Sequence, residues 1–343
     1  MDKFNVIGLD TAKSIFHLVE LHANGKELAC RQLRRSQLLR RMANLKPTTI
    51  AMEACSSSHY WGRRFREMGH QVVLLPAQHI KGYLRGQKND YNDARAIAEA
   101  CLHGRIRSVQ VKSVEQQDLQ ALHRSREQLK KSRNQLANQI RGFLRERGVI
   151  VAVGLAPLRN ALPEILESPN EEVTVFIREL LARDYRRLKS LDEEIDWHDR
   201  QLRQQAKASD VCKRLCRIPG IGPVVSTAFA NWVGDGQQFQ RGRDASAALG
   251  LVPRQHTTGG KPKLGGISKR GDRYLRALLV HGARSVVKQS DRRTDSLSQW
   301  INRLKARHGV NKATVALANK ITRIAWVVVA REENYRPAEA LCS

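Results

Sequence analysis

Residues 4–110 alternate between short apolar runs and amphipathic stretches. Strands are predicted over 5–10, 14–21 and 27–33, where apolar positions recur with the period of a pleated sheet. Asn24-Gly25-Lys26 has the turn chemistry of a hairpin between the second and third of these strands. The three strands are therefore expected to be antiparallel.

Predicted helices and strands alternate through the rest of this region. An Ala-rich, helix-favouring stretch begins at Asp93. The other predicted elements are helices at about 36–44 and 60–68 and strands at 48–53 and 71–76. This order predicts an α/β domain over residues 1–112, a mixed sheet flanked by helices with its functional site at strand ends.

Long, highly charged helices are predicted over residues 113–208. Apolar residues recur every seventh position in two stripes, namely Leu122, Leu129, Leu136 and Phe143, and then Leu181, Leu188, Ile195 and Leu202. A break containing Gly and Pro separates the stripes at 148–170. Two successive heptad stripes indicate an antiparallel helical hairpin or coiled coils that join subunits, although each stripe alone equally fits an amphipathic helix packed on its own domain.

Residues 209–343 are predicted to form a mostly helical third domain, which contains two unusual segments. The first is the turn Ile-Pro-Gly-Ile-Gly-Pro at 218–223, where Gly220 and Gly222 would let backbone N–H groups approach a phosphate, as in a helix–hairpin–helix. A tight turn between packed helices is the simpler explanation. The second is the predicted loop at 255–271, which is rich in glycine, hydroxyls and bases but lacks the order of a P-loop.

Candidate nucleic-acid contacts in and beside this second segment are basic. They are Lys261, Lys263, Lys269, Arg270 and Arg276. His256 and His281 stand apart from other ligand types, so we expect structural or phosphate-contacting roles for them.

The charge of the chain narrows its partners to polyanions. Its 343 residues include 60 Lys and Arg against 33 Asp and Glu, a net charge of +27. Nucleic acid is favoured over a membrane surface, because no run of about 18 apolar residues exists.

The N-terminus lacks a signal-peptide pattern, so a cytoplasmic protein is expected. Six irregularly spaced cysteines suit reduced thiols, and Cys212 and Cys216 are expected to be structural rather than half of a zinc site.

Four acids end apolar runs or begin a predicted helix. An ionised carboxylate among apolar neighbours is costly unless it is paired or binds a metal. Asp10 and Glu53 end predicted strands, and Asp90 and Asp93 are spaced to share one face of a first helical turn. Each alone has an ordinary explanation as a helix cap or a turn-bonding acid. Their joint pattern favours oxygen ligands for Mg²⁺, as one ion or as a pair spanning a phosphate.

Motifs along nearly the whole chain resemble the DEDD-type transposases of the insertion sequence 110 family, within its insertion sequence 1111 branch. The matching segments are Gly-Leu-Asp-Thr-Ala-Lys at 8–13, Met-Glu-Ala-Cys at 52–55, Lys-Asn-Asp-Tyr-Asn-Asp-Ala at 88–94, the turn at 218–223, Gly-Leu-Val-Pro-Arg-Gln-His at 250–256 and Gly-Gly-Ile-Ser-Lys-Arg-Gly-Asp-Arg-Tyr-Leu-Arg at 265–276.

The resemblance implies an N-terminal RuvC-like domain of RNase H fold, a coiled coil and a helical C-terminal transposase domain. Asp10, Glu53, Asp90 and Asp93 match the DEDD metal ligands. The family's serine nucleophile corresponds to Thr258, so this sequence departs from the pattern. Thr258 is the first candidate for the attacking hydroxyl, followed by Ser268 and then Thr257, and an impaired copy is a further alternative.

The function implied is a site-specific DNA recombinase of a prokaryotic cytoplasm and its nucleoid, which excises and inserts an insertion sequence. Its expected partners are double-stranded donor and target DNA, a structured guide RNA encoded by the element, and further copies of the chain in a dimer or tetramer. Two alternatives stay open: a Holliday-junction-type nuclease that forms no covalent intermediate, and a non-catalytic scaffold that binds RNA or DNA.

Overall fold

A computed structural model describes residues 5–87, 89–103 and 106–337. Lys88, Cys342 and the N-terminal residues 1–4 lie outside the described residues. The chain divides into two compact units, Met1–Gln117 and Asp118–Ser343, which are described separately. The three-domain division at residues 112/113 and 208/209 stays a prediction.

The first unit is built on a five-stranded sheet of order β3-β2-β1-β4-β5. Its strands are β1 (Val6–Asp10), β2 (Ile15–Leu21), β3 (Glu27–Arg34), β4 (Thr49–Glu53) and β5 (Gln71–Leu75). The first three strands are antiparallel, whereas β4 and β5 run parallel to β1. The predicted mixed α/β architecture of RNase H type is confirmed.

The two faces of this sheet are covered by different helices. α1 (Arg35–Ala43) and α2 (Ser58–Glu67) pack on the face that Ile7 and Leu9 line. α4 (Asp90–Leu102) packs on the opposite face, with Val6 in its apolar cluster. Since side chains alternate along a strand, Asp10 shares the α4 face with Val6. Short helical turns, α3 (Ala77–Ile80) and η1 (Lys81–Tyr83), precede α4.

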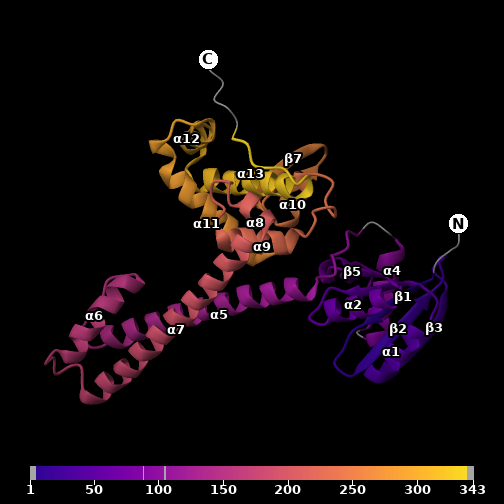
Figure 1. Cartoon of the computed structure of the whole chain (residues 1–343), viewed down its shortest axis with the longest axis horizontal. Coiled ribbons are helices and arrows are strands. Elements are labelled where there is room, and N and C mark those ends of the chain that lie inside the picture. The colour runs from indigo at the N-terminus through magenta and orange to yellow at the C-terminus, as the bar shows by residue number, and fades with distance from the viewer. Residues whose placement is uncertain (1–4, 88, 104–105, 338–343) are drawn as a thin grey trace. The chain divides into compact units, whose positions relative to one another are not determined.

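Two long antiparallel helices, α5 (Val114–Arg145) and α7 (Val175–Ala208), lie side by side (Figure 1), and all of α7 and all but the first turn of α5 belong to the second unit. The ion pair Arg126–Asp199 at 2.6 Å and the pair Arg133–Asp192 at 3.0 Å fix their opposed directions. All four residues of the second heptad stripe are buried, but only Leu136 of the first stripe is. The helical hairpin is confirmed, and the predicted break at 148–170 is corrected because it contains a further helix, α6 (Leu155–Glu167), packed on α7.

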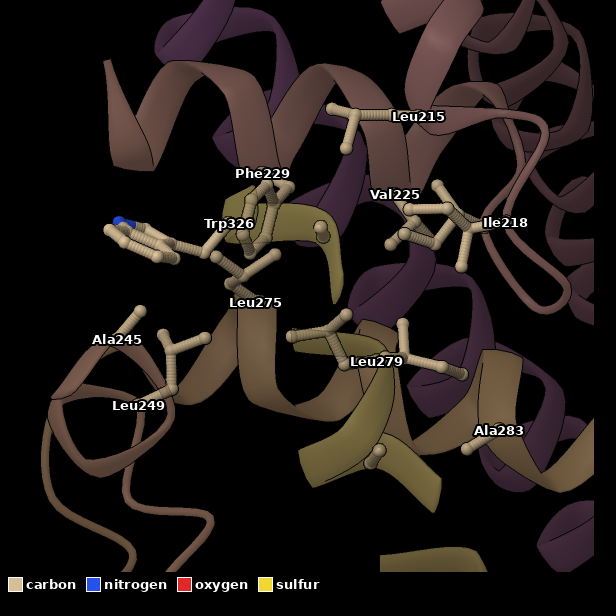
Figure 2. Close-up of a cluster of buried hydrophobic side chains, with 14 of the residues drawn as sticks. Leu215, Ile218, Val225, Phe229, Ala245, Leu249, Leu275, Leu279, Ala283 and Trp326 are labelled. Carbon is tan, nitrogen blue, oxygen red and sulfur yellow. The ribbon is translucent and has the colours of Figure 1, made fainter. Parts of the chain in front are cut away.

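The rest of the second unit is a helical bundle around one apolar core. Its helices are α8 (Asp210–Leu215), α9 (Pro223–Val233), α10 (Gly242–Ala248), α11 (Arg273–Gln289), η2 (Ser290–Arg292), α12 (Ser296–His308) and α13 (Val310–Ala330). Figure 2 shows Phe229, Leu275 and Trp326 meeting in this core, and the Trp326 indole N–H donates to the Gly236 carbonyl at 3.0 Å. The mostly helical C-terminal region is confirmed.

The predicted loop at 255–271 is wrong. The segment is chiefly a β-hairpin of β6 (Pro253–Thr258) and β7 (Lys261–Ile267). Gly259 and Gly260 have φ of +57° and +76°, the left-handed pair that a two-residue hairpin turn needs. Nearly every residue of both strands is exposed. Without a buried face there is no apolar alternation, so the strands leave no signal in the sequence.

One helix of the described residues, α13, is long and apolar enough to cross a membrane by length and composition alone. Leu317 and Ile321 bury one of its faces in the core of the bundle, while Arg323 is exposed. These are the features of a core helix.

Candidate metal centre

Three acids from two elements meet on the α4 face of the sheet. Asp10 ends β1, and Asp90 and Asp93 lie in the first turn of α4. One ligand oxygen from each lies within 4.8 Å of the other two. Glu53 ends the neighbouring parallel strand, one position beyond the pair Leu9–Met52, but it lies outside this close group. The structure therefore brings three of the four predicted acids together, with the fourth beside them.

Gly8 explains how α4 comes so close to the strand. A Cβ at this position would lie 2.7 Å from the Ala98 backbone nitrogen, and closer still to the Ala94 carbonyl oxygen. Only a strand residue without a side chain, facing alanines at positions 94 and 98, permits this contact. Because Asp10 lies two residues after Gly8 and Asp90 one helical turn before Ala94, the same contact sets the spacing of the carboxylates.

Asp90 and Asp93 do not cap α4. The cap is Asn89, whose side-chain oxygen accepts the backbone N–H of Tyr91 at 2.9 Å. Neither acid is therefore the helix cap, and both carboxylates have an oxygen within 4.8 Å of one from Asp10.

The electrostatics of the group favour a cation. Burial, and then the negative charges of Asp93, Asp90 and Glu53, raise the pKa of Asp10, while His17 acts weakly in the other direction. Like charges held this close destabilise the ionised state unless a positive ion joins them. The donors are all carboxylate oxygens, which suit a hard divalent ion such as Mg²⁺ rather than zinc or copper.

His17 is a residue at this centre that the sequence reasoning missed. It pairs with Asp10 across β1 and β2, and its Nδ1 lies 3.6 Å from Oδ2 of Asp90. Its ring also packs edge-on against Tyr91 at 4.7 Å between centroids. The only signal in the sequence is a histidine seven positions after Asp10, which becomes meaningful once the hairpin register is known.

The candidate hydroxyls lie in the second unit and differ in their surroundings. Thr258 pairs with Lys261 across the hairpin, so it shares a face with His256 and Lys263. Thr257 pairs with Pro262 and points to the opposite face. The half-buried Ser268 follows the far end of β7, roughly 20 Å from Thr258 along the strand.

The predicted nucleic-acid contacts divide into exposed side chains and packed positions. Lys261, Lys263, Lys269 and Arg270 are exposed. Arg276 instead donates to the carbonyls of Leu249 and Arg270 at 2.9 Å each.

The two glycines of the 218–223 turn also differ. Gly220 has φ of +89° and lies against Gly282 of α11, so helix packing by itself accounts for it. Gly222 is the N-cap of α9 and has open space around it. A contact of either glycine with nucleic acid stays a prediction.

Comparison with known proteins places both units among transposases. Residues 7–147 match the DEDD transposase model of IS110 type, and residues 212–299 match the model of the transposase IS116/IS110/IS902 family. The chain is 43% identical over 336 residues to the transposase for insertion sequence element IS1111A of Coxiella burnetii, covering 98% of this chain and 92% of that protein. It is 42% identical over 332 residues to a probable family 20 transposase of Pseudomonas aeruginosa, covering 96% and 98%. It is 36% identical over 330 residues to the transposase for insertion sequence element IS1328 of Yersinia enterocolitica, covering 96% and 97%.

Proposed function

This chain belongs to the IS116/IS110/IS902 family of transposases, enzymes that cut and join DNA, and on that premise we propose that its carboxylate centre binds Mg²⁺ for site-specific excision and insertion of a mobile element. The observation that carries the proposal is the meeting of Asp10, Asp90 and Asp93 within 4.8 Å. Glu53 completes the ligand set from the neighbouring strand end. The bound ion, alone or as one of a pair, supplies Lewis acidity at the scissile phosphate.

The residues of the centre have separate parts in this proposal. Asp10 gains most from a bound cation, because burial and its three acidic neighbours raise its pKa and disfavour its ionised form. His17 lies 3.6 Å from Asp90 and orients that carboxylate as an outer-shell partner. Asn89 caps α4, so neither Asp90 nor Asp93 is engaged as the helix cap.

We assign the attacking group to the hydroxyl of Thr258. Its oxygen would form a bond to phosphorus while the bond from phosphorus to a sugar oxygen breaks. The hydroxyl proton passes to solvent, and the released sugar oxygen gains a proton. The covalent link conserves the phosphodiester bond for rejoining. Support comes from the hairpin register, which puts Thr258 on the face of Lys261 and Lys263, where the charge of a phosphate is balanced.

The proposed partners are DNA, a guide RNA and further copies of the chain. Double-stranded donor and target DNA are the substrates, held by a dimer or tetramer in a prokaryotic cytoplasm. A structured RNA encoded by the element selects both DNA sites by base pairing. The net charge of +27 supports polyanionic partners. Sequencing the RNA that copurifies with the protein tests this part, and the lack of any specific RNA would remove guidance from the account.

A denaturing gel tests the covalent step. The protein is produced together with the whole element, so that any encoded RNA is present, and is reacted with end-labelled donor DNA. We expect a protein–DNA adduct with wild type and with Thr258→Ser, and none with Thr258→Ala. Ser268→Ala and Thr257→Ala are matched controls, expected to keep the adduct.

Each contrary result has its own meaning. An adduct that persists in Thr258→Ala but disappears in Ser268→Ala moves the nucleophile to Ser268. DNA cleavage without any adduct supports the alternative of a Holliday-junction-type nuclease. Unchanged cellular activity in Asp10→Ala supports a non-catalytic scaffold.

A further inference from the structure

The C-terminal bundle contains a groove of about 2260 Å³ that none of the candidate sites explains. Its walls come from α12 and α13, and the base of β7 at Gly265, Gly266 and Ile267 forms part of its lining. Among the described residues that line it, nine are Arg or Lys and two are acidic. The groove is therefore strongly cationic and adjoins the hairpin within the same unit.

Four of these cations lie along one helix. Lys312, Lys320, Arg323 and Arg331 line the groove from α13 and its C-cap. Their spacing keeps them within about 100° of one another around the helix axis, over a length of roughly 28 Å. At the 3.4 Å rise of a fully stacked strand, which is its compact spacing, that length accommodates at most about eight nucleotides.

The groove also has an apolar component. Leu297, Ile324 and Val327 line it and are half-buried. Trp300 lies beside them, with Nζ of Lys320 4.5 Å from the centre of its ring. Apolar and aromatic side chains among cations suit a ligand that exposes both flat bases and phosphates.

This combination distinguishes among anionic partners. Duplex DNA keeps its bases stacked inside, so it would meet the cations but not the apolar side chains. A lipid surface is flat, whereas these apolar residues line a concavity. An unpaired strand matches both components.

We propose that this groove binds an unpaired segment of DNA, with phosphates against the cations of α13 and bases against the apolar lining. Because Gly265 and Gly266 also line the groove, a strand bound there continues toward the hairpin. The proposal rests on the proposed function only in taking DNA as the substrate, and it is independent of the carboxylate centre.

Fluorescence anisotropy with a labelled 20-nucleotide single strand tests this assignment. The full chain is titrated in EDTA at several salt concentrations, as wild type and as Lys312→Glu/Arg323→Glu. Both side chains are exposed. We expect the variant to bind at least 10-fold more weakly, and the magnitude of its slope of log K against log salt to fall by about 1.4, since each lost phosphate contact removes about 0.7 for a single strand.

The matched control is Arg303→Glu/Arg307→Glu, which makes the same charge change at exposed positions of α12 that do not line the groove. It should bind within about twofold of wild type. The conservative pair Lys312→Arg/Arg323→Lys should also bind normally, which separates loss of charge from loss of fold.

Three results would overturn the proposal. They are equal weakening by both glutamate pairs, a loss of duplex binding in Lys312→Glu/Arg323→Glu as large as its loss of single-strand binding, and binding of RNA but not DNA. Asp10→Asn is expected to bind the strand as wild type does. Loss of groove binding and loss of the metal centre are therefore distinguishable outcomes.

Discussion

Replacing Gly8 by alanine is expected to disable the proposed metal centre, although Gly8 itself provides no ligand. The added Cβ would lie 2.7 Å from the Ala98 nitrogen and 2.8 Å from its Cβ, where ordinary contacts begin near 3.4 Å. Relief at Ala98 alone requires a movement of about 0.7 Å, and the Ala94 carbonyl is closer still. α4 must therefore retreat from β1 by roughly 1 Å, because backbone atoms, not flexible side-chain ends, oppose the new carbon.

Two effects follow from that movement. Overpacking at a buried contact typically costs about 1–3 kcal/mol of unfolding free energy. The second effect is larger in relative terms, since Asp90 and Asp93 move with α4 while Asp10 stays with β1. A misplacement of about 1 Å at a reacting centre can lower a rate by about 100-fold.

Urea unfolding and a plasmid excision assay measure the two effects on the same preparations. Gly82→Ala is the control, because Gly82 has open space around it and lacks a left-handed φ. That variant should remain within about 0.5 kcal/mol of wild type with full activity. Wild-type stability and activity in Gly8→Ala would refute the argument that this contact positions the carboxylates.

Three further predictions concern buried charge and turn geometry. Asp10→Asn should raise the melting temperature of the metal-free protein at pH 7 while abolishing activity. Burial and then neighbouring carboxylates raise the pKa of Asp10, so its ionisation destabilises the fold as pH rises from about 3.8 through the raised value, and the variant's advantage should vanish at lower pH. His123 is buried between Tyr274 and Thr227, and burial lowers its pKa to about 4. The free energy of unfolding should therefore fall by about 3 kcal/mol as pH falls from 6.5 through 4, because protonation of His123 favours the unfolded chain. In urea unfolding, the free energy of His123→Gln should fall less over the same pH range. Gly220→Ala should cost about 1–3 kcal/mol in the same assay because of its positive φ and its contact with the opposite helix, whereas Gly222→Ala should be nearly neutral.

Much of the first unit is predictable because its signals are local. The strand ends at Asp10 and Glu53 lie where the apolar runs stop, and Asn24-Gly25 makes the predicted hairpin turn. The meeting of Asp10 with Asp90 and Asp93 followed from placing strand ends and helix starts at one edge. The exclusion of Glu53 from the close group depends on side-chain geometry, which no pattern encodes.

The missed features depend on contacts between distant residues or lack a buried face. His17 matters only through its register with Asp10 and its approach to Asp90. β6 and β7 are exposed on both faces, so neither strand shows alternation. The cations of α13 share one face by their helical spacing, but the groove that this face lines depends on contacts between segments distant in the sequence.

The central claim, that the three carboxylates form the metal centre for DNA cleavage, is tested most directly by the cleavage rate of Asp10→Asn with Mg²⁺ present. The substrate is a supercoiled plasmid that carries the element and its flanking DNA. We predict a fall of more than about 100-fold, beyond the loss usual for an outer-shell residue, with DNA binding unchanged and a similar fall for Asp93→Asn. Cleavage by Asp10→Asn at the wild-type rate would contradict the account.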